Sequence, residues 1–230
     1  MRHFLRSLRN KALAPTLKAI EDLRRDHTAD YRQLEALASL LAVLRPRAPF
    51  PPFRGWAISP DFAVLLLTQV LTRRPARVVE LGSGVSTLVL GYALEQTGGQ
   101  LTSVDHDHIY AEQSRITVAQ HALQKVVTIV HAPLEPWRGG TPWYSDAWVR
   151  GLPPIDLLVV DGPPGDTGSL ARYPALPVLA PRLTATASIV VDDANRADEQ
   201  AIVARWLAEQ TGLTATRVET EKGAVVLRWP

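Results

Sequence analysis

The feature that most constrains the fold of this chain is a change in sequence pattern at residue 77, where short β-branched runs begin to alternate with helical stretches. Several of the short runs are almost continuously apolar, as in 78–79, 157–160 and 189–191. A strand that is apolar on both faces must be covered on both faces, and the intervening helices supply that cover. We therefore expect an α/β protein with a doubly wound, mostly parallel sheet.

The alternation predicts seven strands, and the connection from the third to the fourth shows no clear helical period. A short turn at 221–223 joins the last two strands, so these two should pair antiparallel. The predicted strands are 77–81, 101–105, 126–130, 155–161, 187–192, 213–219 and 224–229. The predicted helices of this part are 85–97, 109–122, 169–180 and 197–210, and Ser59-Pro60-Asp61 predicts the start of an earlier one that runs to about residue 72.

Polar and glycine-rich residues follow the first five predicted strands, whereas the opposite strand ends carry much less polar chemistry. An open parallel sheet binds its ligands beyond the carboxyl ends of its strands. The segments in question are 80–87, 105–108, 131–134, 161–166 and 192–196. Their shared position is the strongest functional signal in the residues themselves.

The first two of these segments predict a cofactor that contains a nucleoside. Gly82 and Gly84 let the backbone approach a ligand closely, and Asp105 is placed to accept hydrogen bonds from a ribose diol. A dinucleotide fingerprint needs a third glycine where this chain has Thr87, which is evidence against a nicotinamide cofactor. Considered alone, the turn is also compatible with a strand-to-helix connection that binds nothing.

Residues 79–84, followed by Asp105, resemble the cofactor loop of class I S-adenosylmethionine (SAM)-dependent methyltransferases. The resemblance covers about residues 56 to 230 and implies a Rossmann-like methyltransferase fold, with seven strands that end in an antiparallel hairpin. Ser86 stands where many members have a third glycine, which is a departure in the loop. The cofactor residues implied are Glu80, Gly82, Ser83 and Gly84 around the methionine portion, Asp105 on the ribose, Ala132, Pro133 and Leu134 beside the adenine, and also His106 and Asp161.

The second half of the chain is similar to metal-dependent O-methyltransferases of the catechol and antibiotic-sugar types. Asp161, Asp192 and Asp193 match the acidic metal positions, which implies a divalent cation such as magnesium and a catalytic role for these acids. The catechol type would have an asparagine at position 193 and a lysine near position 164, so the sugar type is the closer match. The alternative is that the three acids cap helices and bind loop amides.

Substrate contacts are predicted at Arg172 and Tyr173, which follow the glycine-containing loop after the fourth strand. A second candidate is the aromatic-rich segment 137–148, whose rings either stack on a sugar or aromatic acceptor or close the core beneath a long loop. His106, His108 and His131 are expected to line the adenosine pocket or to face solvent.

Residues 1–55 differ in charge from the rest of the chain, with 11 Lys+Arg against 5 Asp+Glu, whereas residues 56–230 have 14 against 18. This acidic balance in the second part is evidence against nucleic-acid binding there. The density of prolines in 45–54 predicts a linker. We therefore predict a basic helical extension with its linker at 1–55 and a methyltransferase domain at 56–230.

The extension contains a predicted helix at 16–44. It either pairs with a second subunit to form a homodimer or lies on its own catalytic domain. Residues 1–13 predict a basic helix that is either solvated or in peripheral contact with a membrane. The predicted heptad positions are Ile20, Leu23, Leu34, Leu37, Leu41 and Leu44, and the apolar face of the first segment is Phe4, Leu5, Leu8 and Ala12.

The chain has no cysteine, which excludes disulfides and thiolate-bound metals. It also has no continuous apolar run at its start that would indicate a secretory signal, so we expect a cytoplasmic location. Taken together, the sequence predicts a SAM-dependent methyltransferase that acts on a hydroxyl of a small molecule or sugar. The alternatives are a nicotinamide-dependent oxidoreductase and a non-catalytic scaffold that binds a nucleoside.

Overall fold

A seven-stranded sheet in the order β3-β2-β1-β6-β7-β9-β8 forms the centre of the protein. The structure is a computed structural model that describes residues 2–230, and side chains are described from residue 13 onward, except at residue 139. All neighbouring strands run parallel except β9, which pairs antiparallel with β7 and with β8. The strands are β1 (Arg77–Leu81), β2 (Gln100–Asp105), β3 (Val127–His131), β6 (Ile155–Val160), β7 (Leu183–Val191), β8 (Thr214–Val218) and β9 (Ala224–Arg228).

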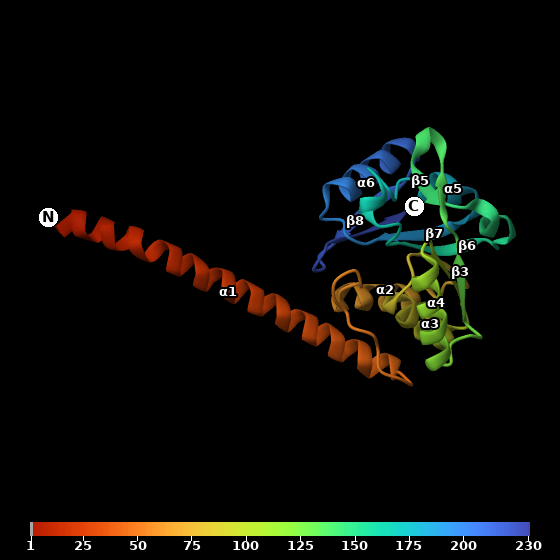
Figure 1. Cartoon of the computed structure of the whole chain (residues 1–230), viewed down its shortest axis with the longest axis horizontal. Helices are drawn as coiled ribbons and strands as arrows, with labels where there is room; N and C mark the ends of the chain where they lie inside the picture. The colour runs from red at the N-terminus through yellow and green to blue at the C-terminus, as the bar shows by residue number, and fades with distance from the viewer. Residues whose placement is uncertain (1) are drawn as a thin grey trace.

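Helices cover the sheet on both faces, as Figure 1 shows. One core lies between the sheet and the helices α2 (Pro60–Arg73), α3 (Val85–Thr97) and α4 (His108–Gln120). The other core lies between the sheet and the helices α5 (Ala175–Leu179) and α6 (Ala197–Glu209). The near-continuous apolar strands are thus buried on both sides, and the predicted doubly wound fold with its terminal antiparallel hairpin is confirmed.

The predicted helix at 169–180 is wrong for most of its length, because only Ala175–Leu179 is α-helical. Two local features explain the difference. Leu170 has a φ of 52°, outside the helical range, and Pro174 has no N–H to donate to an earlier turn. The connection from β3 to β6, where no helical period was found, contains a small hairpin of β4 (Leu134–Pro136) and β5 (Pro142–Tyr144).

The first helix, α1 (Arg2–Leu44), is longer than the predicted 16–44, because it continues through Pro15. A proline removes one intrahelical hydrogen bond, and here the helix continues on both sides of that gap. In Figure 1 the helix projects far from the sheet and its covering helices. The predicted apolar face of Phe4, Leu5, Leu8 and Ala12 lies outside the described side chains. Within the described part of the chain, no helix is long and apolar enough to cross a membrane.

The sheet and the helices that cover it, α2 to α6, are called the body of the protein, and the last turns of α1 belong to its core. Leu40 and Leu44 are buried with residues of α2 and α3, and the side chain of Gln33 donates to Asp61 Oδ2 at 2.8 Å. The proline-dense segment that follows is also fixed, because the side chain of Arg47 donates to the carbonyl of His121 at 2.7 Å and forms an ion pair with Glu95. Only the part of α1 before these contacts stands free of the body.

We expect the variant Leu40→Ala to lose about 2 to 5 kcal/mol of unfolding free energy, because it removes a fully buried side chain and leaves a cavity. Val43→Ala, three residues further along the same helix, is the matched control, since Val43 is 43% exposed. The control should change stability by less than about 0.5 kcal/mol. Urea denaturation of both variants measures the difference. Equal losses would show that the end of α1 is not part of the core.

Candidate active site

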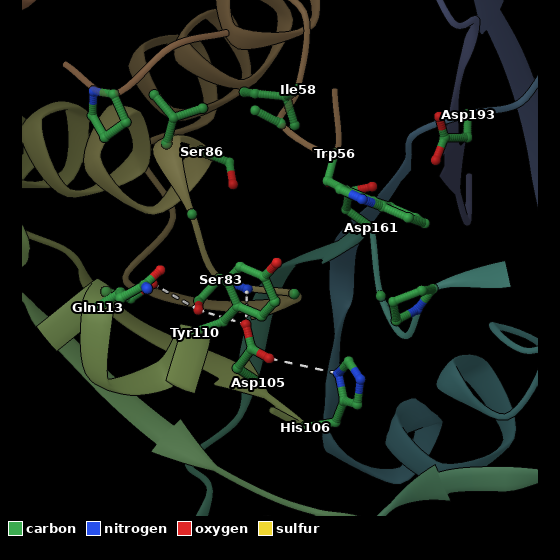
Figure 2. A pocket seen from close by; sticks show the side chains of 18 of the residues that line it. Trp56, Ile58, Ser83, Ser86, Asp105, His106, Tyr110, Gln113, Asp161 and Asp193 are labelled. Atoms are coloured by element: carbon green, nitrogen blue, oxygen red, sulfur yellow. Dashed lines mark hydrogen bonds and ion pairs between the residues drawn. The ribbon is translucent and has the colours of Figure 1, made fainter. Parts of the chain in front are cut away.

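A cavity of about 660 Å³ opens at the carboxyl ends of β1, β2 and β6. It lies where the strand order changes direction, because β1 pairs with β2 on one side and with β6 on the other. Its walls come from the loops after these strands and after β7, from Arg172, from α4, from the start of α3 and from the segment that precedes α2. Figure 2 shows Asp105 and His106 in one part of the cavity, and Asp161 and Asp193 in another.

Two glycines allow the loops after β1 and β6 to pack against each other beneath the cavity. Gly82 has a φ of +90°, and a Cβ added there would lie 3.3 Å from the backbone nitrogen of Gly162. A Cβ at Gly162 would collide with the hydroxyl of Tyr144. Both positions line the cavity, so its floor depends on the absence of side chains there.

Glu80 was predicted to contact the cofactor, but the structure places it beneath the loop rather than on the cavity surface. Its Oε2 accepts hydrogen bonds from Thr87 Oγ1 at 2.5 Å and from Ser103 Oγ at 2.6 Å, and Thr87 in turn accepts from the N–H of Gly84 at 3.0 Å. Complete burial raises the pKa of Glu80 to about 7, although these hydrogen bonds oppose the shift. Glu80 therefore acts on the loop that forms the cavity wall.

Asp105 does line the cavity, and its carboxylate organises the same loop. Oδ2 accepts from the N–H of Ser83 at 3.0 Å and from its hydroxyl at 2.6 Å, and Oδ1 accepts from the N–H of Asp107 at 3.0 Å. The hydroxyl of Ser83 is also 2.8 Å from that of Ser114 on α4. Each carboxylate oxygen has two lone pairs, so the group retains acceptor capacity toward a ligand.

The predicted adenine border is not brought to the cavity, because Ala132, Pro133 and Leu134 are absent from its lining. His106 lines the cavity, whereas His108 and His131 are exposed outside it, with their rings 5.8 Å apart. One face of α4 that was not predicted does line the cavity. The spacing of three and four residues on a helix is the signal that would have revealed this face, which consists of Tyr110, Gln113, Ser114 and Thr117.

The three acids predicted to bind a metal lie together, with one oxygen from each within 4.8 Å of the others. Asp161 and Asp193 line the cavity, and Asp192 lies fully buried behind them. Both carboxylate oxygens of Asp192 and Oδ1 of Asp193 have no hydrogen-bond partner among the described residues. Burial, together with neighbouring acidic charge, raises the pKa of Asp192 to about 8, and burial raises that of Asp161 to about 6 against the effect of Arg172.

Arg172 was predicted to face the substrate, but protein acceptors surround its guanidinium. A guanidinium has five N–H groups. Nε donates to the carbonyl of Pro163 and Nη1 to that of Asp192, both at 3.3 Å. Nη2 contacts Asp193 Oδ2 at 2.9 Å and Asp161 Oδ1 at 3.3 Å, and Nη1 is 3.6 Å from Glu199 Oε1. Arg172 lines the cavity but is only 3% exposed, so its main contacts are with the acids of the cavity wall.

Tyr173 and most of the aromatic segment lie away from the cavity. Tyr173 donates to Glu209 at 2.7 Å, and Arg205 stacks 3.7 Å from the centre of its ring. Trp143 is buried in the core, whereas Tyr144 lines the cavity with a buried hydroxyl that has no partner among the described residues. Trp137 packs on the ring of Tyr173. The segment thus serves mainly the core, apart from Tyr144.

Residues 45–54 were predicted to be a linker, but Pro51 and Pro52 of this segment form one wall of the cavity together with residues 56–58, which follow it. Trp56 is 70% exposed, and the carbonyls on either side of it, of Gly55 and Ala57, accept hydrogen bonds from Lys222 Nζ at 3.3 and 2.8 Å. The turn between β8 and β9 therefore fixes this wall. A proline-rich segment gives no local signal of such a long-range contact.

The similarity of this chain to known proteins agrees with this geometry. A family model described as a methyltransferase domain matches residues 79–194, about half of the chain. The chain belongs to this methyltransferase family. The matched residues run from β1 to the loop after β7, so they include both glycine loops, Asp105 and the three clustered acids. The match therefore covers the loops that end the central strands of the sheet.

Solved structures show the same class I methyltransferase fold. The methyltransferase PaMTH1 of Podospora anserina, bound to S-adenosylhomocysteine (SAH), has a TM-score of 0.66 at 16% identity, covering 90% of this chain and 95% of that one. The O-methyltransferase TomG of Streptomyces achromogenes, bound to SAM, has a TM-score of 0.59 at 18% identity, covering 76% of this chain and 82% of that one. An O-methyltransferase of Bacillus cereus in complex with SAH has a TM-score of 0.60 at 17% identity, covering 84% of this chain and 89% of that one. A comparison with curated proteins found no match.

The buried carboxyl of Glu80 should make the unfolding free energy of the protein depend on pH. Its folded-state pKa of about 7 lies above the ordinary value of 4.5, so the contribution of the neutral group is complete below about pH 4.5 and is lost as the pH rises through 7. The unfolding free energy of the wild type minus that of Glu80→Gln should therefore fall by about 2 to 4 kcal/mol between pH 4.5 and 8, at about 1.4 kcal/mol per pKa unit.

Urea denaturation of the ligand-free protein across this pH range measures that difference. The control is Glu135→Gln, which changes the same functional group at an exposed position. If the Glu80 difference is as flat with pH as that of the control, the buried carboxyl does not titrate near neutrality.

Proposed function

We propose that the protein transfers a methyl group from SAM to a hydroxyl oxygen of a small molecule, with a sugar-like acceptor as the closest fit to its acids. The observation that carries the proposal is the set of residues that line the two parts of the cavity. One part presents Asp105 with the loop of Gly82, Ser83 and Gly84, and the other presents Asp161 and Asp193. A volume of about 660 Å³ lies within the usual range for small-molecule sites.

The cavity residues fit a nucleoside with an amino-acid tail. Asp105 has acceptor capacity for ribose hydroxyls, and its bond from the N–H of Ser83 holds the glycine loop beside it. The polar face of α4, with Tyr110 and Gln113, replaces the predicted 132–134 segment as the candidate border of the base. The buried hydroxyl of Tyr144 supports the fit, because it lines the cavity without a protein partner among the described residues.

The cofactor supplies a methyl group on a positively charged sulfonium, so the protein needs to align an oxygen nucleophile and accept its proton. Alignment requires the reacting atoms to be about 3 to 3.5 Å apart and in line. Asp161 is the candidate proton acceptor, because its side chain reaches the cavity surface with 16% exposure while Arg172 holds its Oδ1. Asp193 is held between Arg172 and Arg196, so its role is to position the charges around Asp161.

A divalent cation fits the same acids. Carboxylate oxygens are the ligands that magnesium and calcium prefer, and the unpartnered oxygens of Asp192 and Asp193 are the natural candidates to hold the ion. Arg172 contacts other oxygens of the cluster, so its presence leaves these atoms available. A cation there would orient the acceptor hydroxyl and lower its pKa.

The family match favours methyl transfer over hydride transfer. Thr87, which stands in place of the third glycine of a dinucleotide loop, bonds to Glu80 and to the N–H of Gly84 and so supports a different loop shape. A scaffold without turnover would still bind SAH, so only detected methyl transfer to an acceptor separates it from an enzyme.

Isothermal calorimetry should show micromolar or tighter binding of SAH and no comparable binding of NAD. Asp105→Ala should weaken SAH binding by about 1.5 to 3 kcal/mol, because charge-assisted hydrogen bonds to the ribose are lost. The matched control is Asp156→Ala, which removes a carboxylate that binds the backbone N–H groups of Ala76 and Arg77 near the opposite end of β6. The control should stay within about threefold of the wild type in affinity. Binding of NAD but not SAH would contradict the proposal.

The proposed metal site predicts that manganese binds in a single class of sites, observed by the loss of the free-ion signal in electron paramagnetic resonance. Asp192→Asn should weaken this binding by tenfold or more, since it replaces a charged ligand. The control is Asp146→Asn, an exposed acid in the 3-10 helix at Asp146–Gly151. Equal manganese binding by the wild type and Asp192→Asn would assign the acids a structural or proton-accepting role.

A further inference from the structure

The first helix carries most of the exposed apolar side chains of the described chain. Eight of the twelve large hydrophobic residues that are exposed belong to α1, and only four belong to all the remaining elements. The exposure of those on α1 ranges from 40% to 67% of the side chain. This concentration along a helix that projects from the body points to a surface that binds a partner.

Six of these eight residues fall on one heptad seam, and Leu23 and Val43 lie outside it. Positions three and four residues apart follow one another from Leu13 to Leu41, which is the spacing of a coiled-coil interface. We call these residues the α1 seam, and all of them are exposed. They are Leu13, Leu17, Ile20, Arg24, His27, Tyr31, Leu34, Ala38 and Leu41.

The seam faces away from the body of its own chain. Leu40 and Leu44 are buried in the body, and Gln33 bonds to Asp61, so these residues mark the opposite side of the helix. The predicted stripe that joined Leu37 and Leu44 with Leu34 and Leu41 therefore divides in two. One set anchors the helix to the body, and the other remains uncovered.

The seam is symmetric about its centre. Arg24 and His27 are the polar positions, and apolar positions lie on either side of them. In a parallel pair of helices in register, Arg24 would face Arg24 of the second copy, which places like charges together. In an antiparallel pair, Leu17 would face Leu34 of the second copy and Ile20 would face Tyr31, so apolar layers would match apolar layers.

The charges of α1 favour the same arrangement. Residues 2–25 contain seven Lys+Arg and two Asp+Glu, whereas residues 26–44 contain one Arg and three Asp+Glu. An antiparallel pair places the basic half of each helix beside the acidic half of the other. We propose that two copies of this chain associate through an antiparallel pair of α1 helices, centred between Arg24 and His27, with the α1 seam as the interface.

An anionic membrane is the competing partner for a basic amphipathic helix. The seam, however, continues into the acidic half of α1 through Tyr31, Leu34 and Ala38, where an anionic surface would repel the helix. A second copy satisfies both halves at once. The pairing does not rest on the methyltransferase proposal, because it uses no residue of the cavity.

Cysteine crosslinking in the full chain tests the geometry directly, because the natural chain has no cysteine. The double variant Leu17→Cys/Leu34→Cys should give a covalent dimer on mild oxidation, seen on a non-reducing gel. Within one helix these positions are about 25 Å apart, so no internal bond can form. Each single variant should stay monomeric on the gel. Crosslinking of the single variants would indicate a parallel pair and overturn the proposal.

Light scattering tests the association itself. The wild type should have the mass of a dimer, and Leu17→Glu should halve it by placing a charge in an apolar layer. Ala29→Glu is the matched control, since it adds the same charge on the other side of α1 and should leave the mass unchanged. A monomeric wild type would overturn the proposal. Sedimentation of that monomer with anionic phosphatidylglycerol vesicles would assign the seam to a membrane instead.

Discussion

The acidic part of the cavity depends on one buried guanidinium. Arg172 connects the loop after β6, the two aspartates after β7 and Glu199 of α6, and each of its N–H groups has a protein acceptor or an ionic partner. Several buried carboxylates in one place repel one another and lose hydration. A positive charge in their midst offsets that cost, and its contacts determine which carboxylate oxygens have a partner. The oxygens that it leaves unpartnered are those proposed to hold a cation.

The two acids at the other part of the site illustrate how burial divides roles between similar residues. Glu80 and Asp105 end neighbouring strands, β1 and β2, and both bind elements of the same loop. Glu80 is enclosed with hydroxyl partners, so it shapes the loop from below. Asp105 reaches the cavity and keeps acceptor capacity for a ligand. Glu80 pairs with Ser103, and Asp105 lies two residues further along β2, so both acids are on the same face of the sheet and differ in how near they lie to its edge.

The sequence predicted the elements whose signals are local. Apolar strand runs, the Ser59-Pro60-Asp61 helix start and the terminal hairpin are confirmed to within a few residues. The glycines and acids at the strand ends were found because a parallel sheet brings those ends to one edge. The helix expected over 169–180 failed where Leu170 and Pro174 impose another backbone path. Residues 132–134 were assigned to the cofactor site by family likeness, yet they are absent from the cavity lining, to which one face of α4 contributes.

What the sequence by itself determined is the doubly wound sheet and the identity of its polar edge, because periodicity and strand ends depend on residues close together in the chain. Only the tertiary structure decided that Arg172 turns inward while Tyr173 turns toward α6, although the two are adjacent. It also decided that the proline-rich segment near Trp56 becomes a cavity wall, held by Lys222 from the far end of the chain. These contacts join residues that are 21 to 165 positions apart in the chain, and their energies depend on burial and charge that no local pattern records.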